Sequence, residues 1–376
     1  MLALSWDIKT LSGRDSFLPT LGIDADRSRP HHFDISRDRA LPRTVTRSGT
    51  PTIEAIFRFE TAFGRASGVL RLTPADGSAD TKAWTLLTAL DELKGYEEAS
   101  GRTRVSGKAY SRDFRGPNWL DLRKQAARYE NRDPAVLVVG GGQAGLSIAA
   151  RLSQLGVDTL IVDRERRIGD NWRHRYHALT LHNQVHVNHL PYMPFPPSWP
   201  TYIPKDKLAN WFESYVDGME LNFWTGTEFE GGSYDEKEGR WTVTLRRNGE
   251  KRIMHPRHIV MATGASGVAN MPDIPSLKNF SGQVLHSSQY DDGENWQGKR
   301  AIVIESRGGL YSEGPAKTMD SQEPHLRTLL GFMGIEDVTF VHAEKLGFGP
   351  EAREQAITTA RARLREVVTG DHRRAA

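Results

Sequence analysis

The sequence contains no cysteine among its 376 residues. Disulfide bonds, thiolate metal sites and redox-active cysteine pairs are therefore excluded, so any redox chemistry must come from a bound cofactor. Apolar runs of membrane-spanning length, about 18 residues, are also lacking. Because the first residues have neither the basic nor the apolar region of a signal peptide, we expect a cytoplasmic protein.

A large excess of charge of one sign is lacking as well. The 50 basic and 47 acidic side chains give a formal net charge of +3. A balance this close gives little attraction to nucleic acid or to a membrane surface, so we expect neither as a partner. The length of 376 residues exceeds one typical core and predicts two or three domains.

The most informative stretch covers residues 135–163. A short apolar run meets the sequence GGGQAG, an apolar-periodic segment follows, and a second apolar run ends at Asp163. This order predicts the strand, glycine turn, helix and strand that bind a dinucleotide, with the phosphates at the helix N-terminus. Gly140 permits the tight turn, Gly142 lets the backbone approach a pyrophosphate, and Gly145 lets helix and strand pack closely. Asp163, about 20 residues later, can accept the ribose hydroxyls.

The N-terminal part predicts a small antiparallel sheet. Residues 24–50 are expected to form a loop, and alternation at 53–60 and two strand-like runs around a polar turn at 75–78 predict strands. The pattern resembles the α+β domain of the ketosteroid-isomerase and nuclear-transport-factor superfamily, with most of its first helix missing. The module at 1–95 is interpreted as a ligand pocket, a homodimer surface or a truncated packing module. Residues 96–133 are predicted to be a linker or covering segment.

A histidine-rich and proline-rich segment follows the sequence GDNW at 169–172. His182, His186 and His189 have the spacing of metal ligands on one helix face. Five prolines between residues 191 and 200 argue against such a helix, so no metal is expected and the segment is predicted to be a loop over the cofactor. Beyond it, periodicity predicts a helix at 205–216 and strands at 221–225, 241–246 and 258–262, with a turn at Asn248-Gly249.

Residues 134–299 resemble the flavin-containing monooxygenases, in a branch also similar to the plant indole-pyruvate monooxygenases. The resemblance depends on GGGQAG at 140–145, GDNW at 169–172, LHN at 181–183 with PFP at 194–196, and ATG at 262–264. It also depends on FSGQVLHSSQY, which fits the identifier FxGxxxHxxxY at Phe280, Gly282, His286 and Tyr290 and comes close to the Baeyer-Villiger version. His286 and Tyr290 are implied to support the linker between nucleotide domains.

The resemblance implies FAD as the cofactor. Trp172 and His182 would lie beside the flavin ring, and an asparagine that steadies the oxygenated flavin in many relatives falls at His182 or at Asn183. The implied catalytic residues are therefore His182 and Asn183. The implied FAD-binding residues are Gly140, Gly142, Gln143, Ala144, Gly145, Asp163, Trp172, His182, Thr263 and Gly264.

In this family NADPH reduces FAD, O2 adds at flavin C4a, and the peroxide transfers one oxygen atom to a small nucleophilic or carbonyl substrate. A second glycine fingerprint for NADPH is expected after the strand predicted at 300–304. The sequence at 305–311 does not fit that fingerprint. NADPH is therefore expected from the family without a recognisable site, and impaired turnover is one expectation.

Residues 300–376 resemble the C-terminal part of the FMN-dependent NADH azoreductases and quinone reductases, which have a flavodoxin-like fold. SRGG at 306–309, LGFMGI at 330–335 and GPEARE at 349–354 are the matching segments. The pattern predicts a helix at 323–333, a strand at 338–341 and a helix at 350–368. FMN is not expected, because the phosphate-binding loop of that family is absent from this sequence. The apolar stripe of the last helix would be Ala356, Ile357, Ala360, Leu364 and Val367.

The predicted fold class is α/β. A Rossmann-like FAD-binding domain at 134–299 follows the small α+β module and its linker, and a flavodoxin-like βαβα tail completes the chain at 300–376. The expected function is an FAD-dependent, NADPH-linked monooxygenase acting on a small molecule with O2. Two alternatives stay open: an FMN-dependent NADH azoreductase or quinone reductase, and a non-catalytic fused or truncated product.

Overall fold

The computed structural model describes residues 4, 8–74, 80–105, 115–265, 267–279, 281–332 and 334–370. The chain divides into two compact units, Met1–Arg173 with His182–Gly267 and His174–Leu181 with Val268–Ala376. The polar turn predicted at 75–78 and the identifier residue Phe280 lie outside the described residues.

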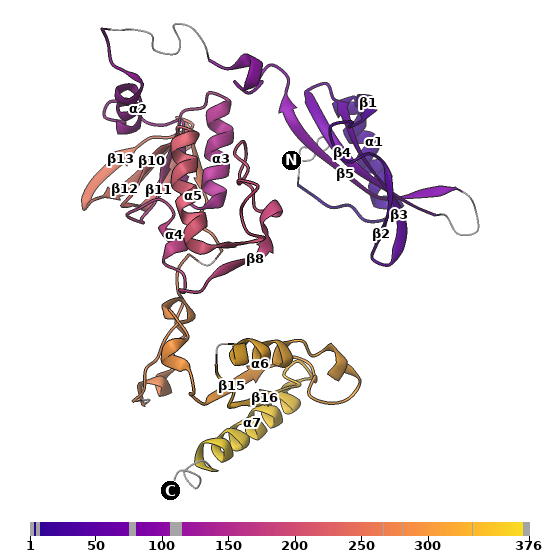
Figure 1. The fold of residues 1–376 in the computed structure, drawn as a ribbon, viewed down its shortest axis with the longest axis vertical. Coiled ribbons are helices and arrows are strands. Elements are labelled where there is room, and N and C mark those ends of the chain that lie inside the picture. Colours follow the sequence, from indigo (N-terminus) through magenta and orange to yellow (C-terminus); the bar gives the residue numbers. More distant parts are fainter. Residues whose placement is uncertain are drawn as a thin grey trace. The chain divides into compact units, whose positions relative to one another are not determined.

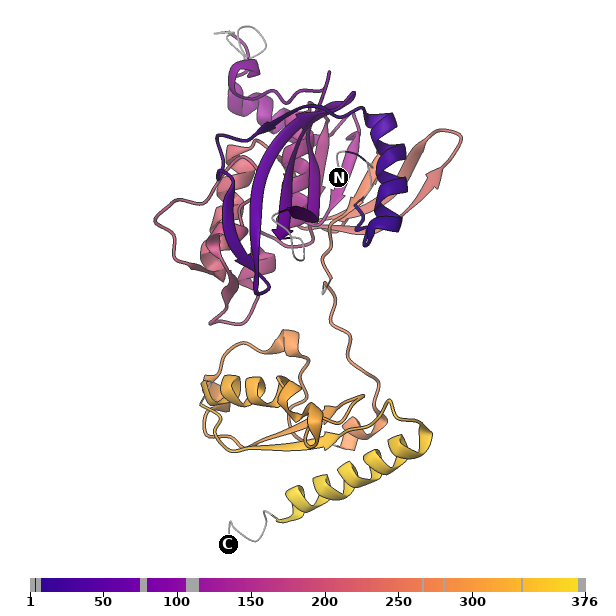
Figure 2. The ribbon, with the colours of Figure 1, turned by 90° about the vertical axis from the view of Figure 1, so that its right-hand side faces the viewer.

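The N-terminal module is an α+β unit. Its sheet has the order β1-β3-β4-β5, with β2 paired to β3, and every pairing is antiparallel. The long strands β3, β4 and β5 curve together (Figure 2). The elements of the module are α1 (Arg14–Ser28), β1 (His31–Ile35), β2 (Arg43–Arg47), β3 (Thr50–Glu60), β4 (Gly64–Pro74) and β5 (Thr81–Leu93).

The loop predicted at residues 24–50 is wrong, and a helix, α1, leads into that range. The end of α1 and the two strands β1 and β2 occupy that range. Helix α1 is polar and contains Pro19, so it has no apolar stripe by which periodicity could reveal it. Strands β1 and β2 are held by backbone pairing with opposite ends of β3, and composition does not show such pairing.

Glu54 on β3 joins three strands of this sheet. It is 4% exposed, and its carboxylate accepts hydrogen bonds from Arg43 Nη2 at 2.8 Å, Arg47 Nη2 at 3.0 Å and Arg71 Nε at 2.7 Å. Arg43 and Arg71 are its register partners on β2 and β4. Hydrogen bonds from Arg47 and Arg71 lower the pKa of Glu54 to about 2. The cluster therefore stabilises the module as long as Glu54 is ionised.

Replacing Glu54 with glutamine should destabilise the full chain by about 2 kcal/mol at neutral pH, because charge-assisted hydrogen bonds are lost. Since folding lowers the pKa of Glu54 from 4.5 to about 2, its contribution is present above pH 4.5 and is lost as the pH falls toward 2. Unfolding followed by circular dichroism should thus show a smaller loss of stability over that range in Glu54→Gln. The exposed Glu236→Gln is the matched control, and equal acid sensitivity of the variant and wild type would contradict the assignment.

The central domain is built on a parallel sheet of order β10-β7-β6-β14. All residues of β6 and β7 are buried, and α3 packs on both strands, with α5 beside it (Figure 1). This confirms the predicted Rossmann-like fold. The elements are β6 (Val136–Val139), α3 (Gln143–Gln154), β7 (Thr159–Val162), α5 (Lys205–Gly218), β10 (Asn222–Trp224) and β14 (His258–Met261).

An antiparallel sheet follows β10, in the order β11-β12-β13. The turn predicted at Asn248-Gly249 joins β12 to β13, and both residues have positive φ angles of 51° and 90°, as a tight hairpin turn requires. The strands are β11 (Thr227–Asp235), β12 (Arg240–Arg247) and β13 (Glu250–Met254), and the shorter elements of this unit are η1 (Gly101–Thr103), α4 (Asp170–Arg173), η3 (Val185–Val187) and β9 (Tyr202–Pro204).

The end of the predicted linker covers the central domain. Residues 119–128 form α2 (Trp119–Arg128), and the carbonyl of Ala127 accepts a hydrogen bond of 2.7 Å from Trp224 Nε1. Tyr129 is 1% exposed, and its hydroxyl donates to Asp158 at 2.7 Å. Tyr129 belongs to the same apolar cluster as Leu137, Leu160, Trp224 and Leu245.

The second unit contains the two parallel strands β15 and β16. Helices α6 and α7 lie on opposite faces of this pair (Figures 1 and 2). The predicted stripe of α7 is confirmed, because Ala360 is buried and its other four members are half-buried. The elements are β15 (Ala301–Ser306), α6 (Gln322–Phe332), β16 (Val338–Ala343) and α7 (Pro350–Gly370), with the short helices η4 (Pro275–Asn279), η5 (Ser287–Gln289), η6 (Glu294–Trp296) and η7 (Pro315–Met319).

In the part of the chain that the structure describes, no helix combines the length and apolar character that crossing a membrane requires.

Candidate functional site

The glycine turn between β6 and α3 admits no side chain at two of its positions. Gly140 has a φ of 107°, which L side chains rarely adopt, and a β-carbon there would overlap the carbonyl of Ala262. A β-carbon on Gly145 would overlap the carbonyl oxygen of Gly140. Helix α3 therefore approaches the end of β6 as closely as two backbones can.

Asp163 holds the turn from the end of β7. Its Oδ2 accepts a hydrogen bond of 2.6 Å from the amide of Gly141, and its Oδ1 accepts one of 2.9 Å from the amide of Glu165. A carboxylate offers about four acceptor sites. Two of them therefore remain for hydroxyl groups of a ligand, as the predicted ribose contact requires.

Phe223 is a residue of this site that sequence reasoning missed. It lies on β10 opposite Ile161 of β7, and a β-carbon on Gly141 would overlap its ring. The middle glycine is thus constrained by an aromatic ring about 80 residues later in the chain, a distance beyond the span of the local βαβ motif. No local pattern in the sequence could have indicated it.

Helix α3 begins at an open N-terminus. Gly142 is its N-cap, with φ −78° and ψ −174°, and no side chain caps the helix. The amide groups of a helix's first turn have no partners within the helix and favour an anion through the helix dipole. Gln143 and Ala144 in this turn are exposed, so a pyrophosphate has access to these amides.

The segment that precedes β8 lies beside Gly142. A β-carbon on Gly142 would lie 3.2 Å from Asn171 Nδ2, and one on Gly169 would overlap the carbonyl of Ala209 on α5. Asp170 is 8% exposed and accepts from Arg173 Nη1 at 3.0 Å. The sequence GDNW therefore places Trp172, on α4, in a helical turn next to the glycine turn.

Thr263 and Gly264 follow β14 after one residue, Ala262. This strand pairs with β6 in parallel, and the amide of Ala262 donates to the carbonyl of Val139 at 2.8 Å. Since β7 and β14 flank β6 on opposite sides, the carboxyl ends of β6 and β14 form the switch point at which open α/β sheets bind ligands. Gly140 and Thr263 meet at that point.

His182 and Asn183 lie on β8 (Thr180–Gln184), which pairs with β9. Both side chains are exposed, and the carbonyl of Asn183 accepts from Asn188 Nδ2 at 3.2 Å. Their roles beside a flavin ring stay predictions. His189, the last of the three spaced histidines, accepts at Nδ1 a hydrogen bond of 2.9 Å from the amide of Phe195.

The identifier residues His286 and Tyr290 have structural contacts in the second unit. His286 Nδ1 accepts from the amide of Ser288 at 3.1 Å and thereby caps η5. The ring of Tyr290 packs on that of Tyr176, with centroids 6.1 Å apart. Their role in supporting the linker between nucleotide domains stays a prediction.

Two cavities lie away from the glycine turn. One, of about 220 Å³, is lined by residues that include Ala149, Asp158 and Thr159, at the amino end of β7. Another, of about 400 Å³, lies around Trp224 and Arg247. Neither contains a residue of the predicted cofactor set, and the backbone geometry of the turn is the better guide to a phosphate site.

Replacing Gly145 with alanine should destabilise the central domain by about 2–3 kcal/mol, because the added methyl group can be accommodated only by moving α3 away from β6. Thermal unfolding of the full chain checks this. Ala144→Ser, one residue earlier on the exposed side of the same turn, is the matched control and should change stability by less than about 0.5 kcal/mol. Equal effects of the two substitutions would show that α3 does not approach β6 as described.

Two family models match this chain. Residues 133–310 match the flavin-binding monooxygenase-like family, and residues 273–368 match the flavodoxin-like fold family. The two matches overlap at residues 273–310, a range that contains β15. The sequence is thus similar to two families whose matches share residues 273–310.

Curated relatives divide in the same way. Indole-3-pyruvate monooxygenase YUCCA1 of Oryza sativa subsp. japonica is 33% identical over 186 residues, which are 49% of this chain and 45% of that protein. FMN-dependent NADH:quinone oxidoreductase of Hyphomonas neptunium is 65% identical over 71 residues, which are 19% of this chain and 34% of that protein. The chain spans less than half the length of each. Among solved structures, the flavin-containing monooxygenase from Stenotrophomonas maltophilia is 25% identical, with a TM-score of 0.43 over 56% of this chain and 58% of that one.

Proposed function

We propose that the domain at residues 133–310, which belongs to the flavin-binding monooxygenase-like family, binds FAD and serves an NADPH-linked monooxygenase. The observation that supports this most is the open first turn of α3 beside Gly142, at the switch point of the parallel sheet. An anionic dinucleotide fits that position by charge and by backbone clearance. Small-molecule substrates with O2 are the reactants that this function requires.

Different residues around the glycine turn would bind different parts of FAD. The amides at the start of α3 would hold the pyrophosphate, and the two unused acceptor sites of Asp163 would take the ribose hydroxyls. Thr263 and Gly264 would close the site from β14, and Trp172 would pack on the ring system. Bound FAD, once reduced by NADPH, supplies the activation of O2 for transfer of one oxygen atom to a nucleophilic or carbonyl substrate.

We assign to His182 and Asn183 hydrogen bonds that would slow the release of hydrogen peroxide from the site until a substrate is present. Exclusion of water by the segment that carries them, β8, would serve the same purpose. For NADPH, residues 305–311 lack a glycine fingerprint and Arg307 is enclosed by acidic side chains. Slow reduction by NADPH is therefore part of the proposal.

A second candidate function comes from the tail. Its 65% identity to part of an FMN-dependent NADH:quinone oxidoreductase favours an NADH-linked quinone or azo reductase. The matched part is 34% of that protein, and the loop SRGG directs Arg307 into a buried network of ion pairs. FAD therefore fits this chain better than FMN, and the identity of the released flavin separates the two candidates.

Purified full-length chain should be yellow and release one FAD per polypeptide, with little FMN. Gly142→Leu should lose the FAD while keeping its far-ultraviolet circular dichroism spectrum. The extended backbone at Gly142 is one that any residue adopts, the near neighbour of a β-carbon there is the end of the Asn171 side chain, and the added bulk occupies the phosphate position. Ser153→Ala, at the exposed far end of α3, is the control and should retain full flavin content. A folded chain that stays colourless when supplied with FAD would refute the proposal.

His182→Ala should raise the hydrogen peroxide released per NADPH oxidised several-fold, because the hydrogen bond that we assign to His182 is lost. Peroxide and NADPH are measured together in the presence of O2. His186→Ala, exposed in the same segment, is the control. Unchanged coupling in His182→Ala, with raised peroxide release in Asn183→Ala, would transfer the role to Asn183.

A further inference from the structure

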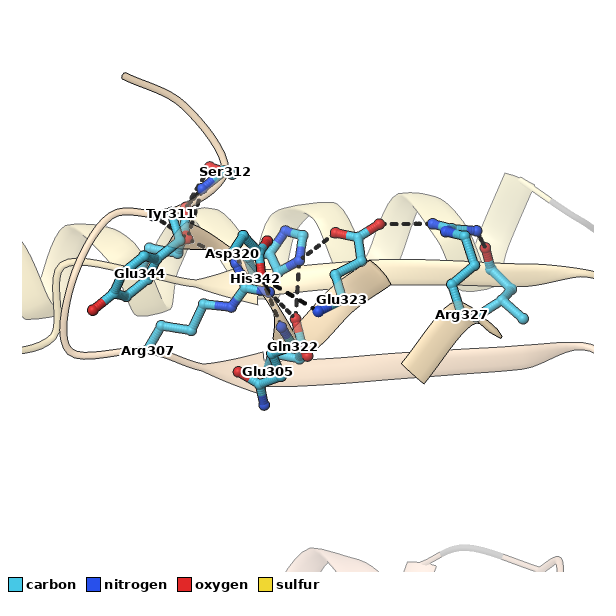
Figure 3. A network of polar contacts seen from close by, with 11 residues as sticks. Glu305, Arg307, Tyr311, Ser312, Asp320, Gln322, Glu323, Arg327, His342 and Glu344 are labelled. Atoms are coloured by element: carbon cyan, nitrogen blue, oxygen red, sulfur yellow. Dashed lines mark hydrogen bonds and ion pairs between the residues drawn. The ribbon is translucent and has the colours of Figure 1, made fainter. Parts of the chain in front are cut away.

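A buried network of charged side chains joins β15, β16 and the start of α6 (Figure 3). Its centre is Arg307, whose side chain is 3% exposed. Arg307 pairs with Glu305 at 2.6 Å, with Asp320 at 3.1 Å and with Glu344 at 3.2 Å. One guanidinium thus serves three carboxylates.

His342 extends the network along β16. It is the register partner of Glu305 in the parallel pair, and its Nε2 lies 3.1 Å from Glu305 Oε2 and 3.1 Å from Glu323 Oε2. Glu323 is on α6, where its other oxygen accepts from Arg327 Nη2 at 2.7 Å. Figure 3 shows the imidazole between the two carboxylates.

The atoms at the centre of this group lack hydrogen-bond partners. Glu305 is 4% exposed, and its Oε1 and the Nε2 of His342 are both buried without a hydrogen bond. A ring nitrogen carries at most one hydrogen, yet two carboxylate oxygens face this one at the same distance. If the imidazole is neutral with its lone pair at Nε2, that lone pair faces two negative charges.

The described network also lacks positive charge. Its four carboxylates are Glu305, Asp320, Glu323 and Glu344, and its two guanidiniums are Arg307 and Arg327. Taken with their usual charges, these six groups sum to minus two, so the network is short of two positive charges, an expensive condition for buried groups.

We propose that Glu305, Glu323 and His342 bind one divalent transition-metal ion, with Zn²⁺ as the preferred metal. Their ligand atoms all lie within 4.8 Å of one another. Zinc takes imidazole and carboxylate ligands at about 2.0–2.2 Å in tetrahedral geometry, which sets neighbouring ligand atoms about 3.3 Å apart. The two distances of 3.1 Å from His342 are close to that value. The all-oxygen ligand sets that Mg²⁺ and Ca²⁺ prefer do not fit the imidazole.

A bound ion would satisfy each feature of the cluster. It supplies the two missing positive charges, gives Nε2 of His342 a partner, and uses an oxygen of the buried Glu305. Arg307 and Arg327 would orient the two carboxylates, as outer partners of metal ligands do. Because the ligands come from β15, α6 and β16, metal binding would also stabilise the packing of α6 on the strands.

Protonation of His342 is the rival explanation. A proton supplies one charge and one hydrogen bond, so it leaves one carboxylate oxygen at Nε2 without a donor. The two explanations differ in their response to added zinc at neutral pH: zinc has to displace a proton from an imidazolium, whereas a neutral imidazole binds it directly.

The test uses the full chain stripped with EDTA and then dialysed against ZnCl2. We expect about one zinc per chain at this site by mass spectrometry of the metal, and a higher melting temperature than that of the stripped protein. His342→Gln and Glu323→Gln should weaken zinc binding by more than about tenfold. His325→Gln, exposed on α6 two residues from Glu323, is the matched control and should bind zinc like wild type.

Two further measurements keep the result interpretable. X-ray absorption at the zinc edge of the wild-type chain should show one imidazole nitrogen among oxygen ligands, a readout that does not depend on the folding of any variant. His32→Gln tests the exposed group of His31, His32 and Glu60 and should leave this zinc in place. The proposal is overturned if the folded, stripped chain takes up no zinc, or if uptake survives in His342→Gln but not in His32→Gln.

Discussion

The close approach of Gly145 to the carbonyl oxygen of Gly140 is the constraint on which the central domain depends. Because neither residue has a side chain, α3 can start directly above β6 and pack on both β6 and β7. That position leaves the first amides of α3 at the carboxyl edge of the sheet, where Asp163 holds the turn through Gly141. The open first turn of α3 and the packing of the domain are therefore two results of one backbone contact, and a side chain that disturbed the packing would also disturb that turn.

The features predicted from the sequence are those that a local pattern determines. Glycine at 140 and 145, the buried runs of β6 and β7, and the stripe on α7 each follow from a few neighbouring residues. Strands β1 and β2 are held by their pairing with β3, and helix α1 is polar and lacks an apolar stripe. Glu54 shows the same limit: alternation placed it on the polar face, but three arginines from neighbouring strands make it a buried residue, while Ile53 is 39% exposed. Phe223 could be assigned to the site only after β10 was placed beside β7.

The loop SRGG shows how a resemblance and a structure can give different information about one residue. The resemblance gives SRGG as a segment that matches the FMN-dependent reductases. In this chain Arg307 of the loop is enclosed by Glu305, Asp320 and Glu344, two of which lie 13 and 37 residues away in sequence. Since those partners are separated by a helix and a strand, no pattern near residue 307 could have revealed them.

The stability of the tail should depend on this network, because charged side chains are as common as apolar ones among the buried side chains described there. Among the described residues after 300, the buried apolar side chains are Ile335, Val341 and Ala360, and the buried charged ones are Glu305, Arg307 and Glu344. The described part of the sheet is one parallel pair, which provides few backbone hydrogen bonds and leaves strand edges without partners. A small apolar core offers little to offset the desolvation of three charges. The packing of α6 on β15 and β16 should therefore depend mainly on whether the charges of this network are balanced. The identity of the charged side chains should matter more to the stability of the tail than the shape of its small apolar core.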